Sequence, residues 1–298
     1  MMDSKAPARE TARMYSSCFD LALPARYPAE SVINFFARRA IPGVEHVAGL
    51  RYRRSFALDQ VPGWFEADLA TGSVSVRHPL SAATDLVQAR VRALFDLDAP
   101  QAQIRRCFLR DARLGALLRV QRDIRVPGCW DGFELGVRAV LGQQITVAAA
   151  RTIAARIIAR HAQPIPGAAE GETCGRLFPP AQVFADADLD GLGLTGARIA
   201  TLRALARALL CGELDFDPAQ TLARFVARCT AVRGIGDWTA HYMAMRALRD
   251  ADAFPAGDIV LRKVLRPGTT LSAKELEQAS QAWRPFRAYA VLLLWAAG

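Results

Sequence analysis

The sequence predicts a mainly α-helical protein that begins with a small α+β domain. Segments in which apolar and polar residues alternate, as in half-buried strands, occur within the first hundred residues. Beyond residue 99, Ala, Leu and Arg recur at helical spacing, and Pro and Gly separate the helical segments. The length of 298 residues also favours more than one domain, because single cores stop growing at roughly 250–300 residues.

The α+β domain is expected over residues 17–100, after a polar segment at 1–16 that is typical of a flexible arm. Within it, a hairpin turn is expected at 70–72, and Ser31 is placed to cap a helix. The predicted elements are strands at 17–23, 50–58, 64–69 and 73–77 and helices at 31–39 and 81–97.

The remainder, residues 101–298, is expected to be helical throughout. Pro and Gly mark the ends of the segments, and Asp217 followed by Pro218 begins one of them. The longest predicted loop covers 162–181. The predicted helices lie at about 101–121, 133–160, 197–211, 218–229, 237–249, 258–265 and 273–297.

Composition and charge exclude several classes of protein. With 52% hydrophobic and 22% charged residues, the chain is neither disordered nor collagen-like. No run of about 18 uncharged apolar residues is present, which excludes a membrane span. Residues 1–17 lack the apolar core of a signal peptide, so we expect a cytoplasmic protein. The excess of 38 Lys+Arg over 29 Asp+Glu, a net charge of +9, weakly favours a polyanionic partner.

The cysteines are scattered, without a CxxC pair or a histidine at zinc-ligand spacing. This pattern does not provide the ligands of a zinc site and excludes a cysteine-ligated iron–sulfur cluster near the C-terminus, so we expect no metal held by side chains. Free, buried thiols are the expected state. The six cysteines are Cys18, Cys107, Cys129, Cys174, Cys211 and Cys229.

Residues 191–196 fit the G-x-G-x-x-G pattern of dinucleotide-binding sites. That pattern follows a buried strand in such sites, whereas here it follows the stretch ADLD at 187–190, with no series of parallel strand–helix units around it. A turn between two helices is the better interpretation. A nucleotide-dependent oxidoreductase is only a remote alternative.

The segment 232–240, VRGIGDWTA, lies between two predicted helices and contains two glycines that permit a very tight turn. Such a hairpin exposes backbone N–H groups at the start of the second helix, where they and the helix dipole favour a phosphate. The candidates for a contact to a DNA backbone are Gly234, Ile235 and Gly236. A simple connection between two helices is the alternative.

The hairpin and the loop that follows resemble the signature of helix-hairpin-helix DNA glycosylases. Asp258 ends the loop FPAGD, 22 positions after Gly236. Residues 130–146 and 283–295 are similar to the 3-methyladenine DNA glycosylase II family, the AlkA type, and the resemblance covers about 17–298. It implies the helix-hairpin-helix glycosylase fold, with an antiparallel sheet domain before two helical domains. The resemblance divides the helical region into a central domain at about 130–250 and a second domain formed by 101–129 with 251–298.

Asp258 precedes an apolar helical run, so by itself it is a candidate helix N-cap. The resemblance places it where the family has its catalytic carboxylate, and both roles can hold together. Cleavage of an N-glycosidic bond develops oxocarbenium-like charge at C1′. A carboxylate beside the sugar stabilises that charge while it orients or deprotonates the attacking water. An N3- or N7-alkylated purine already carries positive charge and leaves without a separate general acid.

Trp238 and Tyr242 are four residues apart on one predicted helix and share a face. Two such aromatic residues are commonly part of a core. The resemblance implies instead that they line a pocket for a flipped base, together with Trp295 and Phe35. An electron-rich cleft attracts a cationic base by stacking and cation–π interaction, worth roughly 0.5–2 kcal/mol per contact. Such a pocket accepts a broad range of alkylated bases.

The residue two positions after the hairpin's second glycine separates two kinds of glycosylase. In family members that also cut the backbone as lyases, it is a lysine that forms a Schiff base. Here it is Trp238, which implies a monofunctional enzyme that uses water, needs no cofactor and leaves an abasic site. The family's hairpin often holds a monovalent cation on backbone carbonyls, which would fall at 230–235.

A base that leaves the duplex opens a gap that a side chain must fill. The matching position is Gln144, where AlkA-type enzymes can carry an apolar residue. The alternative is that Gln143 and Gln144 are simple surface glutamines. The basic residues near the hairpin and Asp258 are candidates for phosphate contact or form a solvated surface: Arg246, Arg249, Arg262, Lys263 and Arg266.

The sequence therefore predicts a monomeric, bacterial, nucleoid-associated DNA glycosylase of base excision repair. Its expected partner is double-stranded DNA that contains alkylated purines of the 3-methyladenine and 7-methylguanine type. One alternative is a glycosylase for uracil, hypoxanthine or oxidised purines. The other is a non-catalytic helix-hairpin-helix DNA-binding module, in which Asp258 only caps a helix.

Overall fold

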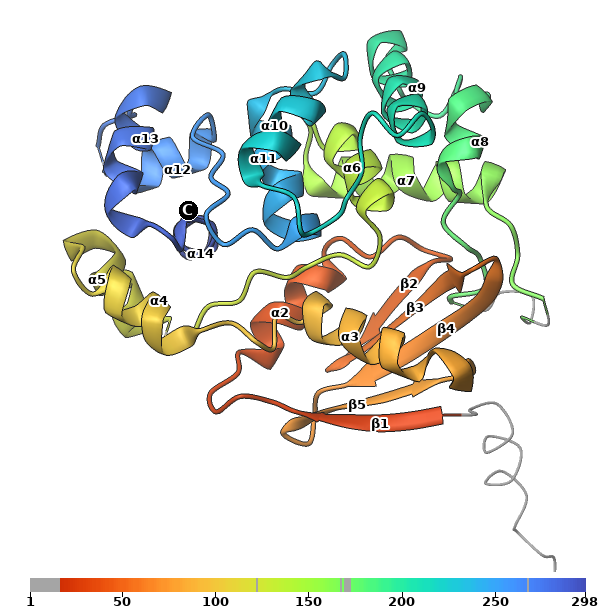
Figure 1. The fold of residues 1–298 in the computed structure, drawn as a ribbon, viewed down its shortest axis with the longest axis horizontal. Helices are drawn as coiled ribbons and strands as arrows, with labels where there is room; N and C mark the ends of the chain where they lie inside the picture. The colour runs from red at the N-terminus through yellow and green to blue at the C-terminus, as the bar shows by residue number, and fades with distance from the viewer. Residues whose placement is uncertain (1–16, 122, 167, 169–172, 267) are drawn as a thin grey trace, which may run out of the picture.

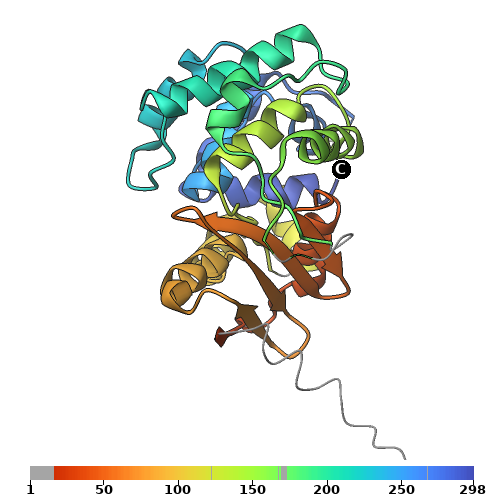
Figure 2. The same ribbon diagram turned by 90° about the vertical axis from the view of Figure 1, so that its right-hand side faces the viewer.

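The computed structural model describes residues 17–121, 123–166, 168, 173–266 and 268–298. A sheet domain lies on one side of the molecule and a larger set of helices on the other (Figures 1 and 2). The predicted arm at 1–16 lies outside the described residues. The sheet is antiparallel and has the order β1-β5-β4-β3-β2. Its strands are β1 (Ser17–Ala22), β2 (Glu45–Ala48), β3 (Arg51–Leu58), β4 (Val61–Asp68) and β5 (Ser73–His78).

Two helices pack against the sheet, α2 (Ala29–Ala37) and α3 (Thr84–Leu94), the latter after the 3₁₀ turn η1 (Ser81–Ala83). Alternate residues of the strands point into the core that they share with these helices. Trp130 comes from the helical part of the chain and enters this core, with its ring 4.5 Å from that of Phe56 and 4.9 Å from that of Phe65. This aromatic contact joins the two halves of the molecule.

The elements of the sheet domain agree with the prediction except in three details. Strand β2 was not predicted, because four residues at an edge carry little periodicity. Strand β4 begins three residues before the predicted start. Ser31 is not the N-cap of α2: Pro28 holds that position, and the amide of Val32 donates to its carbonyl at 3.0 Å. The helix therefore begins two residues earlier and leaves Ser31 within its first turn.

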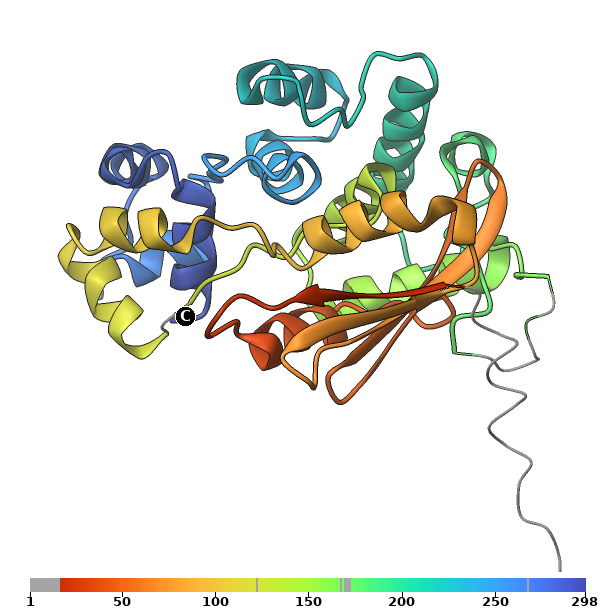
Figure 3. The ribbon, with the colours of Figure 1, turned by 60° about the horizontal axis from the view of Figure 1, so that its bottom comes forward.

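The helical region has eleven α-helices among the described residues, and they form two groups. Helices α6 to α11 lie together, while α4, α5 and α12 to α14 gather at the other end, where 101–120 and 259–295 lie side by side (Figures 1 and 3). The bounds are α4 (Gln101–Phe108), α5 (Ala112–Val120), α6 (Gly132–Leu141), α7 (Val147–His161), α8 (Ala181–Asp186), α9 (Gly196–Leu210), α10 (Leu222–Ala231), α11 (Asp237–Met243), α12 (Ile259–Val264), α13 (Ala273–Ser280) and α14 (Arg287–Trp295), with a π turn η2 (Ala244–Leu248) and a 3₁₀ turn η3 (Gln281–Trp283).

Three helices predicted as continuous are each divided. The Asp111 carboxylate accepts from the amides of two residues and so begins α5, and the Thr146 hydroxyl accepts from Ala149 and begins α7. Pro285 ends the helical run before α14, because it has no N–H to donate. Helix α10 begins at the N-cap Thr221 rather than at the predicted Asp217 and Pro218.

The glycines at 191–196 form a connection between α8 and α9. Gly191 and Gly193 have φ values of +74° and +90°, and Thr195 caps α9. A short helix precedes them instead of a buried strand. The helix-to-helix turn is therefore confirmed, and the predicted loop 162–181 ends where α8 begins.

The thiols are free, as predicted, but burial was predicted wrongly for part of the set. Cys174 and Cys229 are buried, whereas Cys18 and Cys211 are exposed. Cys18 faces outward on the edge strand β1, and Cys211 follows the end of α9. In the described part of the chain no helix is long and apolar enough to cross a membrane.

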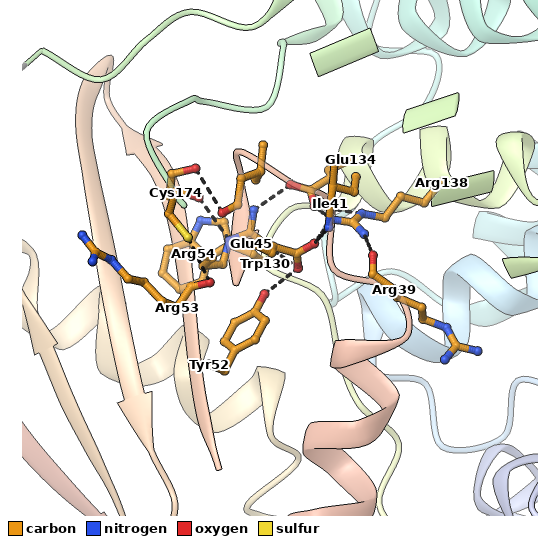
Figure 4. A network of polar contacts seen from close by, with 12 residues as sticks. Arg39, Ile41, Glu45, Tyr52, Arg53, Arg54, Trp130, Glu134, Arg138 and Cys174 are labelled. Atoms are coloured by element: carbon orange, nitrogen blue, oxygen red, sulfur yellow. Dashed lines mark hydrogen bonds and ion pairs between the residues drawn. The ribbon is translucent and has the colours of Figure 1, made fainter. Parts of the chain in front are cut away.

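Charged side chains hold the sheet domain against α6 (Figure 4). Arg54 of β3 reaches Glu134 at 2.7 Å, and Arg138 bonds the same carboxylate at 2.9 Å through Nε. Arg138 also pairs with Glu45, which accepts from the Tyr52 hydroxyl at 2.6 Å. Burial alone would raise the pKa of Glu134, but the two arginines outweigh it and hold the pKa at about 2. We call Glu45, Tyr52, Arg54, Glu134 and Arg138 the interface network.

Candidate active site

A cavity of about 480 Å³ opens between the sheet domain and the helices, within the size range of small-molecule sites. It receives side chains from α2, α6, α7, α11, α12 and α14, so distant parts of the chain form one wall. The lining residues that bear on function are Phe36, Arg39, Arg138, Trp238, Tyr242, Arg246, Asp258 and Trp295. This cavity joins Asp258 to three of the four predicted pocket aromatics.

Asp258 lies at the start of α12 and has only 8% of its surface exposed. Oδ1 accepts from the amides of Val260 (2.9 Å) and Leu261 (3.0 Å), so the predicted N-cap role is confirmed. Oδ2 accepts from the indole Nε1 of Trp238 at 2.8 Å. The carboxylate is thus fixed from two sides while it lines the cavity. The Trp238 contact joins two helices that the sequence could not place next to each other.

The aromatic residues form a stack on the wall of the cavity. The rings of Trp238 and Tyr242 lie 5.3 Å apart between centroids and only 6° from parallel. Trp295 of α14 lies 6.3 Å from Tyr242. All three side chains are partly exposed, whereas a core pair would be buried. Their position favours the pocket interpretation over the core interpretation.

Phe35 does not line this cavity; the neighbouring Phe36 does. Adjacent residues of a helix point about 100° apart, so only one of the two faces Asp258. Phe35 lies instead in an adjoining cleft of about 660 Å³ that shares Arg39 and Trp295 with the cavity. Its ring supports the guanidinium of Arg39, 3.8 Å from the centroid, and that of Arg246, 4.8 Å away.

The arginines of the cavity wall, Arg39 and Arg246 among them, were not predicted to belong there. Arg246 is buried, donates to the carbonyls of Pro127 (2.8 Å) and Gly128 (2.7 Å) and bonds the Tyr242 hydroxyl at 2.7 Å. It is therefore not placed for the phosphate contact considered above. Burial alone would raise the pKa of Tyr242, but Arg246 and Arg39 outweigh it and lower that pKa. Arg246 follows Tyr242 by four residues, and this helical spacing is the sequence signal that could have placed Arg246 beside Tyr242.

The hairpin between α10 and α11 requires glycine at its first tight position. Gly234 has a φ of +91°, and a Cβ there would lie 2.0 Å from Oγ1 of Thr201 on α9. Ile235 is buried and donates to the carbonyl of Val232 at 3.0 Å, while Gly234 and Gly236 are exposed. The backbone of the glycines is thus available at the surface. A cation on the carbonyls of 230–235 stays a prediction.

The turn between α6 and α7 is bonded to this hairpin. Gln143 donates to the carbonyl of Gly234 at 3.1 Å and to the hydroxyl of Thr239 at 3.2 Å. It is therefore not the simple surface residue of the alternative interpretation. Gln144 is exposed and has a φ of +58°, in the left-handed backbone region that residues other than glycine seldom adopt. The turn presents Gln144 beside the hairpin, as a gap-filling role would require.

Comparisons with known proteins agree with these features. Residues 18–131 match the AlkA N-terminal domain, and residues 137–285 match the HhH-GPD superfamily of base excision DNA repair proteins. The DNA-3-methyladenine glycosylase 2 of Escherichia coli is 33% identical over 89% of this chain and 92% of its own. A probable bifunctional transcriptional activator/DNA repair enzyme AlkA of Mycobacterium tuberculosis is 35% identical over 98% of this chain.

The chain spans about 60% of the length of that mycobacterial relative. Among solved structures, a 3-methyladenine DNA glycosylase from Archaeoglobus fulgidus has the same fold, with a TM-score of 0.82 over 93% of this chain and 97% of that one at 20% identity. The family models cover both the sheet domain and most of the helical region. The chain therefore belongs to the HhH-GPD superfamily of base excision DNA repair proteins, with an AlkA-type N-terminal domain.

Proposed function

We propose that this protein is a monofunctional DNA glycosylase that removes alkylated purines, of the 3-methyladenine and 7-methylguanine type, from duplex DNA. The observation that carries the proposal is a buried carboxylate, Asp258, in one cavity with the aromatic rings of Trp238, Tyr242 and Trp295. The family membership supports the substrate class, as do the relatives from Escherichia coli and Archaeoglobus fulgidus that are 3-methyladenine DNA glycosylases.

In the proposed reaction the damaged nucleotide leaves the duplex and its base enters the cavity. The rings of Trp238 and Tyr242 attract a cationic base through their faces. The bond between C1′ and the base nitrogen breaks, and its electron pair leaves with the base. Asp258 stabilises the positive charge that develops at C1′. Water then adds to C1′ and gives up a proton to the Asp258 carboxylate, which passes it to solvent, and the products are an abasic site and the free base.

The lysine content supports hydrolysis without strand cleavage. The sequence contains three lysines, and of these Lys263 and Lys274 lie in the described residues. Neither lines the cavity, and the hairpin position that a lyase lysine would take holds Trp238. Within the part of the chain that the structure describes, no lysine amine is therefore placed in the cavity for a Schiff base with the sugar.

Binding of the damaged duplex would use the features that lie beside the cavity. The exposed backbone of Gly234 and Gly236 is suited to a phosphate, and Gln144 is placed to fill the gap that the flipped base leaves. The net charge of +9 favours a polyanionic partner. We propose that one copy of the chain acts on one lesion, as a monomer in the cytoplasm at the nucleoid.

The test is release of bases from duplex DNA methylated at purine nitrogens, for the wild type and for Asp258→Asn. Asparagine retains the oxygen that caps α12 but carries no charge. We expect the variant to fold normally and to release bases about a thousandfold more slowly. Strand breaks should appear only after alkali is added.

Three other outcomes would contradict parts of the proposal. Release of uracil, hypoxanthine or an oxidised purine without release of methylated purines would assign another lesion. No release from any substrate would identify a DNA-binding module in which Asp258 only caps a helix. Equal rates for wild type and Asp258→Asn would remove Asp258 from the chemistry.

A further inference from the structure

Two guanidinium groups lie on the wall of the cavity beside Tyr242. Arg246 bonds two backbone carbonyls and the Tyr242 hydroxyl, all of them neutral groups. Arg39 donates to the backbone carbonyl of Phe35 at 3.2 Å and lies over the ring of that residue. Within the described residues, neither arginine forms an ion pair with a carboxylate. Their positive charge is therefore not cancelled by a direct partner.

The position of Arg39 is fixed through its backbone. Arg138 of the interface network donates to the carbonyl of Arg39 at 2.8 Å, and the Arg39 side chain points away from that network (Figure 4). The guanidinium lies where the cavity and the adjoining cleft meet. Burial lowers the pKa of Arg39 and Arg246 adds to this effect, whereas Tyr242 opposes it. Arg39 thus faces the same aromatic wall as Arg246.

This arrangement sets two forces against each other for a base stacked on Trp238 and Tyr242. The ring faces attract a positive base. A guanidinium at the same wall repels a positive base and offers N–H donors to a keto oxygen. Arg246 uses three of its five N–H donors on the protein. Arg39 uses one on the carbonyl of Phe35 and also interacts with the Tyr242 hydroxyl, so Arg39 keeps more donors for a ligand. The choice between a cationic and a neutral base therefore depends on Arg39.

We propose that Arg39 is a specificity-determining residue of the base pocket, which disfavours cationic bases and favours neutral bases that carry a keto oxygen. The proposal rests on the proposed function, because it assumes that the cavity receives a flipped base. It adds a charged residue of the sheet domain to a site whose carboxylate and aromatic stack, Asp258, Trp238, Tyr242 and Trp295, come from the helical region.

The experiment compares single-turnover release of 7-methylguanine, which is cationic in the nucleotide, with release of hypoxanthine, which is neutral. Arg39→Met and Arg39→Gln remove the charge, and Arg39→Lys retains it. We expect both neutral variants to raise the ratio of 7-methylguanine to hypoxanthine release roughly tenfold, as expected for the loss of one partly screened charge. Arg39→Lys should keep a ratio within about twofold of the wild type.

Arg38→Met is the matched control. Arg38 is the next residue along the chain, is exposed and lines the adjoining cleft but not the cavity. Its replacement removes the same charge at a different place and should leave the ratio unchanged. A parallel change in both release rates for the Arg39 variants would assign Arg39 a structural role and overturn the proposal. An unchanged ratio would overturn it as well.

A binding measurement separates this proposal from the proposed function. Quenching of tryptophan fluorescence is measured with the 7,9-dimethylguaninium cation and with neutral 9-methylhypoxanthine. The neutral Arg39 variants should bind the cation roughly tenfold better relative to the neutral base. If this change in relative binding is seen but the protein releases no base, Arg39 determines which base the cavity binds, and the proposed glycosylase reaction is wrong. If the wild type releases no base and its fluorescence is not quenched by either compound, both proposals are overturned.

Discussion

The interface network and the cavity wall use arginine in opposite ways. In the network, Arg54 and Arg138 meet the carboxylates of Glu45 and Glu134, and the charges cancel one another. On the cavity wall, Arg39 and Arg246 meet carbonyls, a phenol and an aromatic ring. Paired charges hold two domains together and leave little field for a ligand. Charges with neutral partners keep their field, and a ligand that enters the cavity experiences it.

Two buried carboxylates show the same contrast on the acidic side. Glu134 lies between two arginines, and its pKa is about 2. Asp96, at the end of α3, accepts from the amide of Val126 at 3.0 Å and from the hydroxyl of Tyr289 at 3.3 Å. Burial raises the pKa of Asp96 to about 6, although the Val126 amide and the nearby charge of Arg125 oppose the shift. Burial raises the pKa of both carboxyl groups, and only the two arginines bonded to Glu134 are strong enough to reverse that direction.

The largest expected effect is on the paired region. Glu134→Ala leaves Arg54 and Arg138 in a buried site without their shared carboxylate, so we expect a loss of about 3–5 kcal/mol in the free energy of unfolding, measured with urea. Asp98→Ala is the control, because Asp98 pairs with Arg92 at the surface. That change should cost about 1 kcal/mol or less. Equal losses would show that the network is no more important than a surface ion pair.

The second effect concerns Asp96 and pH. The pKa of Asp96 is raised in the folded state, so its contribution to stability is complete below about pH 4 and is lost as the pH rises through about 6. Asp96→Asn is neutral at every pH. Between pH 4 and pH 7, we expect the free energy of unfolding of the wild type to fall by about 2–3 kcal/mol relative to that of Asp96→Asn.

Chemical denaturation at several pH values measures this difference. Asp98→Asn, which changes an exposed carboxylate, should follow the pH dependence of the wild type closely. A constant difference between the wild type and Asp96→Asn across the range would contradict the contrast between the two buried acids.

The smallest effect concerns the way in which the cavity holds its own carboxylate. Trp238→Phe keeps an aromatic face next to Tyr242 but removes the N–H that donates to Asp258. We expect the single-turnover rate of base release to fall about tenfold, in line with the loss of one hydrogen bond to a charged group, while DNA affinity and stability stay the same. Trp295→Phe is the comparison, because Trp295 lies near Tyr242 and belongs to a different helix. An equal fall in the rate of base release for both variants would show that Trp238 contributes only its stacking surface and not its hydrogen bond to Asp258.

Much of the fold follows from local patterns, and the errors have local causes. Alternation identified four of the five strands, and helical spacing identified the helical region. The breaks at Asp111 and Thr146 were missed, although both residues are good N-caps, because apolar spacing continues across each of them. The short α8 was missed because six residues give too weak a pattern.

The site was predictable where one helix carries it. Trp238 and Tyr242 share a face by their spacing, and the resemblance added Asp258 and Trp295. The cavity wall from the sheet domain could not be predicted in the same way. Arg39 lies near Tyr242 where the chain after α2 meets α6, and Arg138 donates there to the Arg39 carbonyl across a separation of 99 residues. Such a contact leaves no periodic signal in the sequence.

The left-handed backbone at Gln144 bears on how the protein would change under selection. A side chain there costs about 1 kcal/mol that glycine would not, and asparagine tolerates this conformation better than glutamine. A library selected for heat resistance alone would drift toward Gly or Asn at this position. Under the proposed gap-filling role of Gln144, selection for survival after DNA alkylation would retain a longer side chain. The residue that accumulates at position 144 would therefore report which of the two pressures acted on the population.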